Sequence, residues 1–206
     1  MTTWQALNVW VLPHAALLPI WVQLSWAIVV SALVVTFIPI KGARLQVAGA
    51  VGLVMLWLGS SYLALAFQTP SLVTVMWALV CWWQAFVNVA NTDKRGSLSA
   101  VPTWVFAFGV ALGWALVLDT LNLWPSWSNP QLYALGFGAQ AFWFVLLLSA
   151  AALWLAKQGT AVWLSVAALF TVYALLRLPT GNVWDALLDP FVWVSLHWQL
   201  WRRFFK

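Results

Sequence analysis

The chain has 206 residues, of which 65% are hydrophobic and 6% are charged, and its mean hydropathy is +0.92. So few polar side chains cannot cover a water-soluble globule of this length, which excludes ordinary soluble enzymes and binding domains. The net charge of +5 is small and is explained by membrane topology, so we do not read it as a nucleic-acid-binding surface. We therefore predict an all-α integral membrane protein.

Apolar runs separated by short polar breaks predict the membrane-spanning helices. A bilayer core about 30 Å thick takes roughly 20 apolar residues of helix per crossing. We predict one bundle of about seven transmembrane helices, in a single polytopic domain over residues 1–206. The predicted spans are residues 14–38, 46–67, 71–91, 102–121, 131–155, 160–177 and 183–201.

Several breaks carry helix-start signals, among them Asn129-Pro130, which predicts the start of the fifth span, and Gly159-Thr160, which predicts the start of the sixth. Thr69, Pro70 and Ser71 offer a capping side chain and a rigid turn before the third span. Asp189 followed by Pro190 is typical of a cap and a first helical turn. The sequence therefore leaves an alternative open, in which residues 181–189 form a separate short helix before a last span of about 190–205.

The distribution of basic residues predicts the orientation. With the N-terminus outside and seven spans, eight of the nine Lys and Arg residues fall on the cytoplasmic side, as the positive-inside rule expects. Only Arg177 falls outside. We therefore predict a multi-pass protein of the cell (inner) membrane with a cytoplasmic C-terminus, and no secretory signal peptide.

A polar stripe is predicted along the third span. Its members recur at spacings of three and four residues, which places them on one helical face. Inside a bilayer, such amides need partners from the bundle interior, a neighbouring helix or a ligand. Trp82 and Trp83 fall beside the stripe, where we expect them to serve packing. The stripe consists of Thr74, Trp77, Cys81, Gln84, Asn88 and Asn91.

The fifth span carries a weaker stripe of Tyr133, Gly136, Gln140 and Trp143, and the first span carries Gln23. Polar side chains beside tryptophans suit a pocket for an aromatic or apolar molecule. The alternative is that each amide is an interhelical hydrogen-bond partner. The candidate ligand-binding residues are Trp77, Gln84, Asn88, Gln140, Trp143 and Gln23.

The chain contains 19 tryptophans. Those at predicted span ends, among them Trp124, Trp184 and Trp201, suit the lipid headgroup level. Others, such as Trp26 and Trp82, fall well inside spans, where an indole N–H must find an acceptor. Small residues point to close helix packing, chiefly in the Gly109-x-x-x-Gly113 motif and secondarily at Gly49 and Gly52.

Four charged residues are predicted to gather on the outer side: Asp119, Arg177, Asp185 and Asp189. A charge near the membrane is costly unless it is paired, so we expect a salt bridge between Arg177 and Asp185 or Asp189. The functional alternative is an outer gate or a proton-coupled carboxylate at the mouth of a pathway.

Catalytic and metal chemistry find little support in the sequence. The single cysteine, Cys81, excludes an intrachain disulfide, and no known catalytic motif is present. His14 and His197 fall at opposite membrane faces, so they cannot ligate one haem together, although ligation by one of them stays open. We predict no catalytic residue, no metal and no cofactor, which favours a non-enzymatic role.

Two functions remain. The first is a small permease, or substrate-binding membrane component, for a neutral, aromatic or apolar small molecule that uses the polar stripe for transport. The second is a non-catalytic subunit or assembly factor of a larger inner-membrane complex, either energy-converting or in contact with pigment or lipid. The expected partners are membrane lipid and other membrane subunits, and no nucleic acid.

Overall fold

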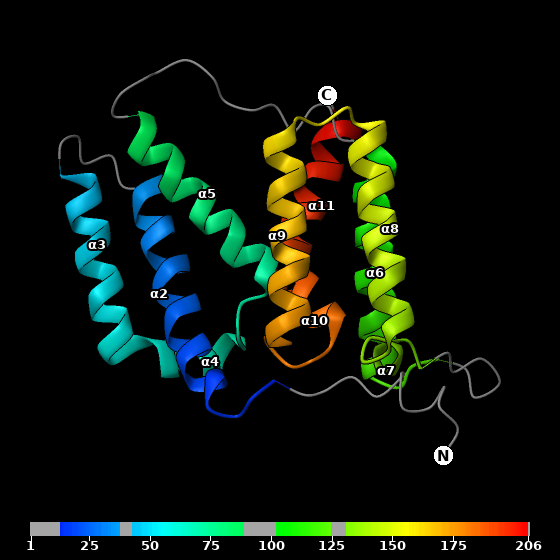
Figure 1. Cartoon of the computed structure of the whole chain (residues 1–206), viewed down its shortest axis with the longest axis horizontal. Helices are drawn as coiled ribbons and strands as arrows, with labels where there is room; N and C mark the ends of the chain where they lie inside the picture. The colour runs from blue at the N-terminus through cyan, green and yellow to red at the C-terminus, as the bar shows by residue number, and fades with distance from the viewer. Residues whose placement is uncertain (1–12, 38–42, 89–101, 125–130, 206) are drawn as a thin grey trace. The chain divides into compact units, whose positions relative to one another are not determined.

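We describe a computed structural model, which places residues 13–37, 43–88, 102–124 and 131–205 (Figure 1). Within these ranges the secondary structure is helical and contains no strand. The chain divides into two compact units, which are described separately. The N-terminal unit holds the described residues from 13 to 88, and the C-terminal unit holds those from 102 to 205.

The helices of the N-terminal unit match the first three predicted spans within a few residues. The second of them is one continuous helical run in which five residues adopt π-helical geometry. The elements are α2 (Leu17–Phe37), α3 (Arg44–Val54), the π-helix η1 (Met55–Gly59), α4 (Ser60–Phe67) and α5 (Leu72–Asn88).

The core of the N-terminal unit lies between α2 and α5. Trp26, Val29 and Ala32 of α2 pack with Val75 and Ala78 of α5, and all five are buried. Their spacing of three or four residues places each set on one helical face. The predicted helix start is confirmed, because the Ser71 hydroxyl accepts a hydrogen bond from the Thr74 amide at 3.1 Å.

The C-terminal unit contains six helices among its described residues. Two predicted spans are divided: residues 131–155 by the turn at 136–138, and residues 183–201 by the break at 188–189. The elements are α6 (Thr103–Thr120), α7 (Leu132–Leu135), α8 (Ala139–Leu155), α9 (Thr160–Leu176), α10 (Val183–Leu187) and α11 (Pro190–Phe204).

The second break has a local cause. The Asp189 carboxylate accepts a hydrogen bond from the Val192 amide at 2.8 Å and so caps α11, whose first residue is Pro190. Proline has no amide hydrogen, so it cannot donate to a carbonyl of a preceding helical turn. The alternative of a short helix before a last helix from about residue 190 is therefore confirmed.

Close packing of α6 against α11 organises the C-terminal unit. A Cβ atom added at Gly109 would lie 2.7 Å from Leu196 Cδ1, and one added at Gly113 would overlap the Trp193 indole. The later residue of α6, Gly113, meets the earlier residue of α11, Trp193, so the two helices run antiparallel. This confirms the Gly109-x-x-x-Gly113 packing motif, whereas a Cβ added at Gly49 would meet no atom within 4 Å.

Two of the described helices are both long and apolar enough to cross a membrane, α2 and α6. Within the 18-residue apolar window of each, 39% of α2 and 17% of α6 are buried. The remaining residues of these two windows are partly or fully exposed in the described structure. Four further apolar helices are shorter, at 10–17 residues.

The glycine contacts generate a paired test. We expect Gly113→Ala to destabilise the fold by about 1–3 kcal/mol, because the new methyl group overlaps the Trp193 ring. We expect Gly49→Ala to be neutral or to stabilise by up to about 1 kcal/mol, because Ala favours a helix over Gly and the site is open. Thermal unfolding of both variants in detergent measures the difference, and equal melting temperatures would contradict this packing.

Candidate functional site

The polar stripe of α5 does not lie in a single environment. Thr74 is buried beside Ser71, Cys81 is half-buried, and Trp77 is 46% exposed. Gln84 is exposed. Buried and exposed members therefore alternate along the stripe, with Thr74 buried near its start and Gln84 exposed nearer its end.

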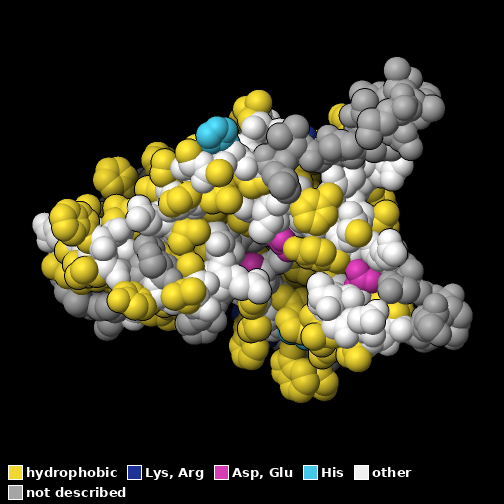
Figure 2. All heavy atoms as spheres, turned by 90° about the horizontal axis from the view of Figure 1, so that it is seen from below, with side chains coloured by type: hydrophobic (Ala, Val, Ile, Leu, Met, Phe, Trp, Pro, Cys, Tyr) yellow, Lys and Arg dark blue, Asp and Glu magenta, His cyan; other side chains and the backbone are white. Residues whose placement is uncertain are grey.

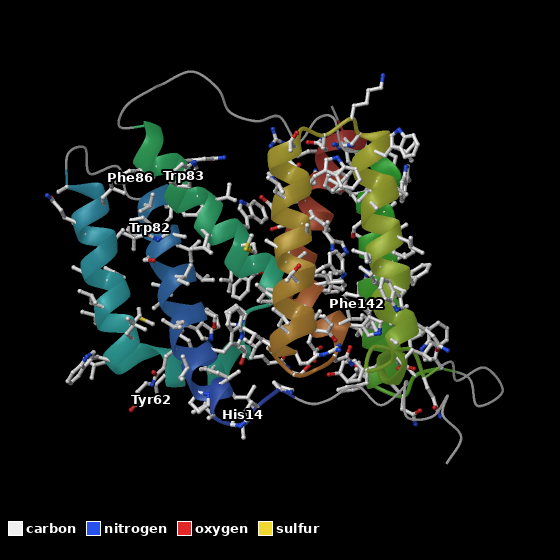
Figure 3. The ribbon with its side chains drawn as sticks, viewed as in Figure 1. His14, Tyr62, Trp82, Trp83, Phe86 and Phe142 are labelled. Atoms are coloured by element: carbon white, nitrogen blue, oxygen red, sulfur yellow. The ribbon has the colours of Figure 1, made fainter. Side chains whose placement is uncertain are left out.

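The two tryptophans beside the stripe have different roles. The Trp82 indole N–H donates to the Ser31 hydroxyl of α2 at 2.8 Å, so this side chain joins the two helices (Figure 3). Trp83 is 67% exposed and its ring stacks on Phe86. The prediction that both tryptophans serve packing within the bundle is confirmed for Trp82, whereas Trp83 presents its ring to the outside of the unit.

Gln23 is exposed on α2. Two hydrogen bonds fix the register of α2 beside α5, one from Trp26 to the Gln68 carbonyl at 3.0 Å and one from Trp82 to Ser31. Gln23 precedes the first of these contacts, and Gln84 follows the second. At 1.5 Å rise per residue, about 12 Å of helix separates Gln23 from the level of Ser31. Gln23 and Gln84 therefore lie at different levels of the N-terminal unit.

In the C-terminal unit, Gln140 and Trp143 are exposed on α8, the latter by 57%. The opposite, inward face of α8 is aromatic: Phe142 stacks on Tyr173 of α9, with ring centroids 5.9 Å apart (Figure 3). The Asn88 side chain and residue Asn91 lie outside the described part of the chain. Whether the six candidate residues form one ligand site stays a prediction.

Two members of the predicted charge cluster are linked through Tyr133, one by its backbone amide and one by its hydroxyl. The Asp119 carboxylate accepts from the Tyr133 amide at 2.8 Å, and the Tyr133 hydroxyl donates to the Asp185 carboxylate at 2.7 Å. Asp185 also accepts from the Thr180 hydroxyl at 2.5 Å. The structure thus brings Asp119 and Asp185 to either side of one tyrosine. Acidic side chains are visible among hydrophobic ones on the face shown in Figure 2.

The other two members of the predicted cluster have separate positions. Asp189 is buried and caps α11, as described above. Arg177 ends α9 in a left-handed backbone conformation, with its guanidinium 5.4 Å from the centroid of the Tyr173 ring. The donors described here for Asp185 and Asp189 are neutral hydroxyl and amide groups, and the expected salt bridge to Arg177 stays a prediction.

Asn182 is the residue at this site that sequence analysis missed. It is fully buried, its side-chain N–H donates to the Tyr133 carbonyl at 2.8 Å, and its side-chain oxygen accepts from the Trp184 amide at 2.9 Å. A Cβ at Gly136 would overlap this amide, so glycine is required there. The signal was present as an N-cap asparagine directly before α10.

Trp184 corrects an expectation. We predicted it at the headgroup level, but it is 6% exposed and its indole N–H donates to the Leu132 carbonyl at 2.8 Å. The apolar ring fills the space above Gly136, and the hydrogen bond satisfies its polar edge. Trp184 and Asn182 together tie α10 to α7.

The electrostatics of Tyr133 favour its protonated form. Burial, and then the hydrogen bond and charge of Asp185, raise the pKa of this hydroxyl well above its usual range. Tyr133 therefore stays a donor at neutral and moderately alkaline pH. Asp119 Oδ1 is buried, and it accepts no hydrogen bond from the described residues.

The chemistry of this cluster is that of a hydrogen-bonded support. The described residues contain no group of three or more His, Cys, Asp and Glu side chains placed to hold a bare metal ion. The two carboxylates are joined through a tyrosine and not paired directly. No family model matches the chain, and comparisons with curated proteins and with solved structures found no match.

The tyrosine chain generates a stability test. We expect Tyr133→Phe to destabilise the protein by about 1.5–3 kcal/mol at pH 7, because it removes a hydrogen bond to a charged group. The raised pKa stabilises the fold fully below the unfolded tyrosine value of about 10, and this contribution is lost as pH rises through the folded value. The difference from wild type should therefore shrink only in strongly alkaline solution.

The matched control is Tyr62→Phe. Tyr62 is 76% exposed, so removing its hydroxyl should change the melting temperature little. Thermal unfolding of both variants at neutral and alkaline pH measures the effect. If Tyr133→Phe and wild type have the same melting temperature at pH 7, the hydrogen bond from Tyr133 to Asp185 does not stabilise the fold.

Proposed function

We propose that the chain is a multi-pass protein of the cell (inner) membrane, with about seven spans and an outer N-terminus. The length, apolar character and low burial of α2 and α6 support this assignment. The shorter α8, with 17 residues, reaches about 25 Å, less than the roughly 30 Å hydrocarbon core. Such a helix is accommodated where the bilayer thins or where flanking residues complete the crossing.

Within that membrane we propose a non-catalytic subunit of a larger complex, which binds partner helices through exposed amide and tryptophan side chains. The observation that carries this proposal is Gln84, an exposed amide in an apolar helix beside the exposed rings of Trp77 and Trp83. Lipid offers no hydrogen-bond partner to an amide, whereas a neighbouring membrane helix does. The surrounding indoles add flat apolar area for helix contact.

The second candidate is the small permease for a neutral, aromatic or apolar molecule. It is favoured by the accessibility of the predicted ligand residues, since Gln23, Trp77, Gln84, Gln140 and Trp143 are all exposed. Accessible amides beside indoles suit a ligand with an aromatic ring and few polar groups. This candidate needs the amides to line one pathway, whereas the subunit proposal needs only one partner helix.

One double variant tests the proposal and separates the candidates. We expect Gln84→Leu with Asn88→Leu to weaken a partner association about 10-fold or more, because each interhelical amide bond contributes roughly 0.6–2 kcal/mol. The control is Gln158→Leu, which replaces an amide in the turn between α8 and α9 whose N–H donates to its own turn. Native mass spectrometry after gentle extraction from the membrane measures the bound partner.

The outcomes differ clearly. A stoichiometric protein partner that the double variant loses, and Gln158→Leu keeps, supports the subunit. A lone chain that carries a small bound mass and transports it supports the permease. Partner binding and transport that are both unchanged in a folded double variant would contradict both candidates.

A further inference from the structure

A separate feature of the C-terminal unit lies on α11, and none of Asp119, Asp185 and Asp189 lines it. An open groove of about 460 Å³ follows one face of this helix, a volume within the range of small-molecule sites. Its lining residues recur at spacings of three and four and are aromatic or aliphatic apart from one histidine. They include Val194, His197, Trp198, Trp201, Phe204 and Phe205.

The histidine is held in a defined orientation. Nδ1 of His197 lies 2.8 Å from the backbone carbonyl of Trp193. A carbonyl can only accept, so Nδ1 carries the proton and Nε2 of the neutral ring keeps its lone pair. The Trp193 and Trp114 rings stand nearly perpendicular to the imidazole, with centroids 4.7 and 6.5 Å away, and limit its rotation.

A ring that is held through one nitrogen and keeps the lone pair of the other meets a requirement of metal-ligating histidines. Such residues usually donate their other ring N–H to a carbonyl or carboxylate, which fixes the tautomer and raises ligand basicity. One histidine alone cannot hold a bare metal ion, and no other His, Cys, Asp or Glu is grouped with it in the described part of the chain. It suffices for a metal that brings its own four equatorial ligands, as haem iron does.

We propose that His197 supplies the single axial ligand to a metal-bearing tetrapyrrole that lies along the aromatic face of α11. The lining is apolar apart from His197, which suits the apolar body of such a molecule, and Trp201 and Phe205 stack within it at 4.1 Å between centroids. Arg202 is exposed in the last turn of α11 and has the charge to meet the carboxylates of a dicarboxylic porphyrin. This inference does not depend on the proposed subunit function.

The test is a titration of the purified full-length protein in detergent with ferric protoporphyrin IX, followed in the Soret region. We expect saturable binding with one porphyrin per chain. His197→Gln should weaken this binding at least 10-fold, whereas His14→Gln should bind as wild type, because His14 lies exposed before α2 and outside the groove. Equal binding by His197→Gln and wild type would overturn the proposal.

A second titration needs no variant and so does not depend on the folding of His197→Gln. Metal-free protoporphyrin IX has the same ring and carboxylates but no iron to ligate. Wild type should bind the ferric form at least 10-fold more tightly than the metal-free form. Equal affinities, or ferric porphyrin that only partitions into the micelle without saturation, would overturn axial ligation by His197.

Discussion

Three tryptophans join separate segments of this chain by donating an indole N–H to an oxygen, and much of the architecture depends on these contacts. In the N-terminal unit Trp26 donates to the Gln68 carbonyl and Trp82 to the Ser31 hydroxyl, which fixes α2 against α5. In the C-terminal unit Trp184 donates to the Leu132 carbonyl and ties α10 to α7. An apolar chain has few other side chains that combine a large buried area with one directional bond.

The same constraint explains why the carboxylates of the C-terminal unit lie where they do. Asn182 and Trp184 hold α7 in place, and α7 carries Tyr133, which bridges Asp119 and Asp185. Gly136 leaves room for the Asn182 amide. The sequence suggested that these charged residues could form a gate. In the structure each carboxylate instead accepts a hydrogen bond that holds a helix or its neighbour in place.

The functional proposals follow from side chains that this packing does not use. Three side chains face outward from their own units: Gln84, Trp83 and Gln140. The neighbouring Trp82 and Phe142 instead contact other helices of the same unit. In the proposed membrane, an amide on an outward face of an apolar helix needs a hydrogen-bond partner beyond that face. His197 differs from these groups, since its Nδ1 contacts a carbonyl of its own helix while its side chain lines the groove on α11.

The sequence alone determined the helical class, the approximate limits of the long helices, the cap at Asp189 and the close packing at Gly109 and Gly113. These features depend on hydropathy and on local backbone chemistry, which neighbouring residues report directly. Helical periodicity also grouped the α5 stripe on one face. It cannot tell which part of that face a neighbouring helix will cover, so the change from buried Thr74 to exposed Gln84 could not be predicted.

Only the tertiary structure decided which polar groups meet. The bond from Tyr133 to Asp185 joins residues 52 positions apart, and the bond from Asn182 to Tyr133 joins residues 49 apart. Trp184 was predicted at a lipid interface because it stands next to a span end, but its burial depends on the space above Gly136, on another helix. Such contacts arise from the register and approach of distant helices, which local sequence patterns do not encode.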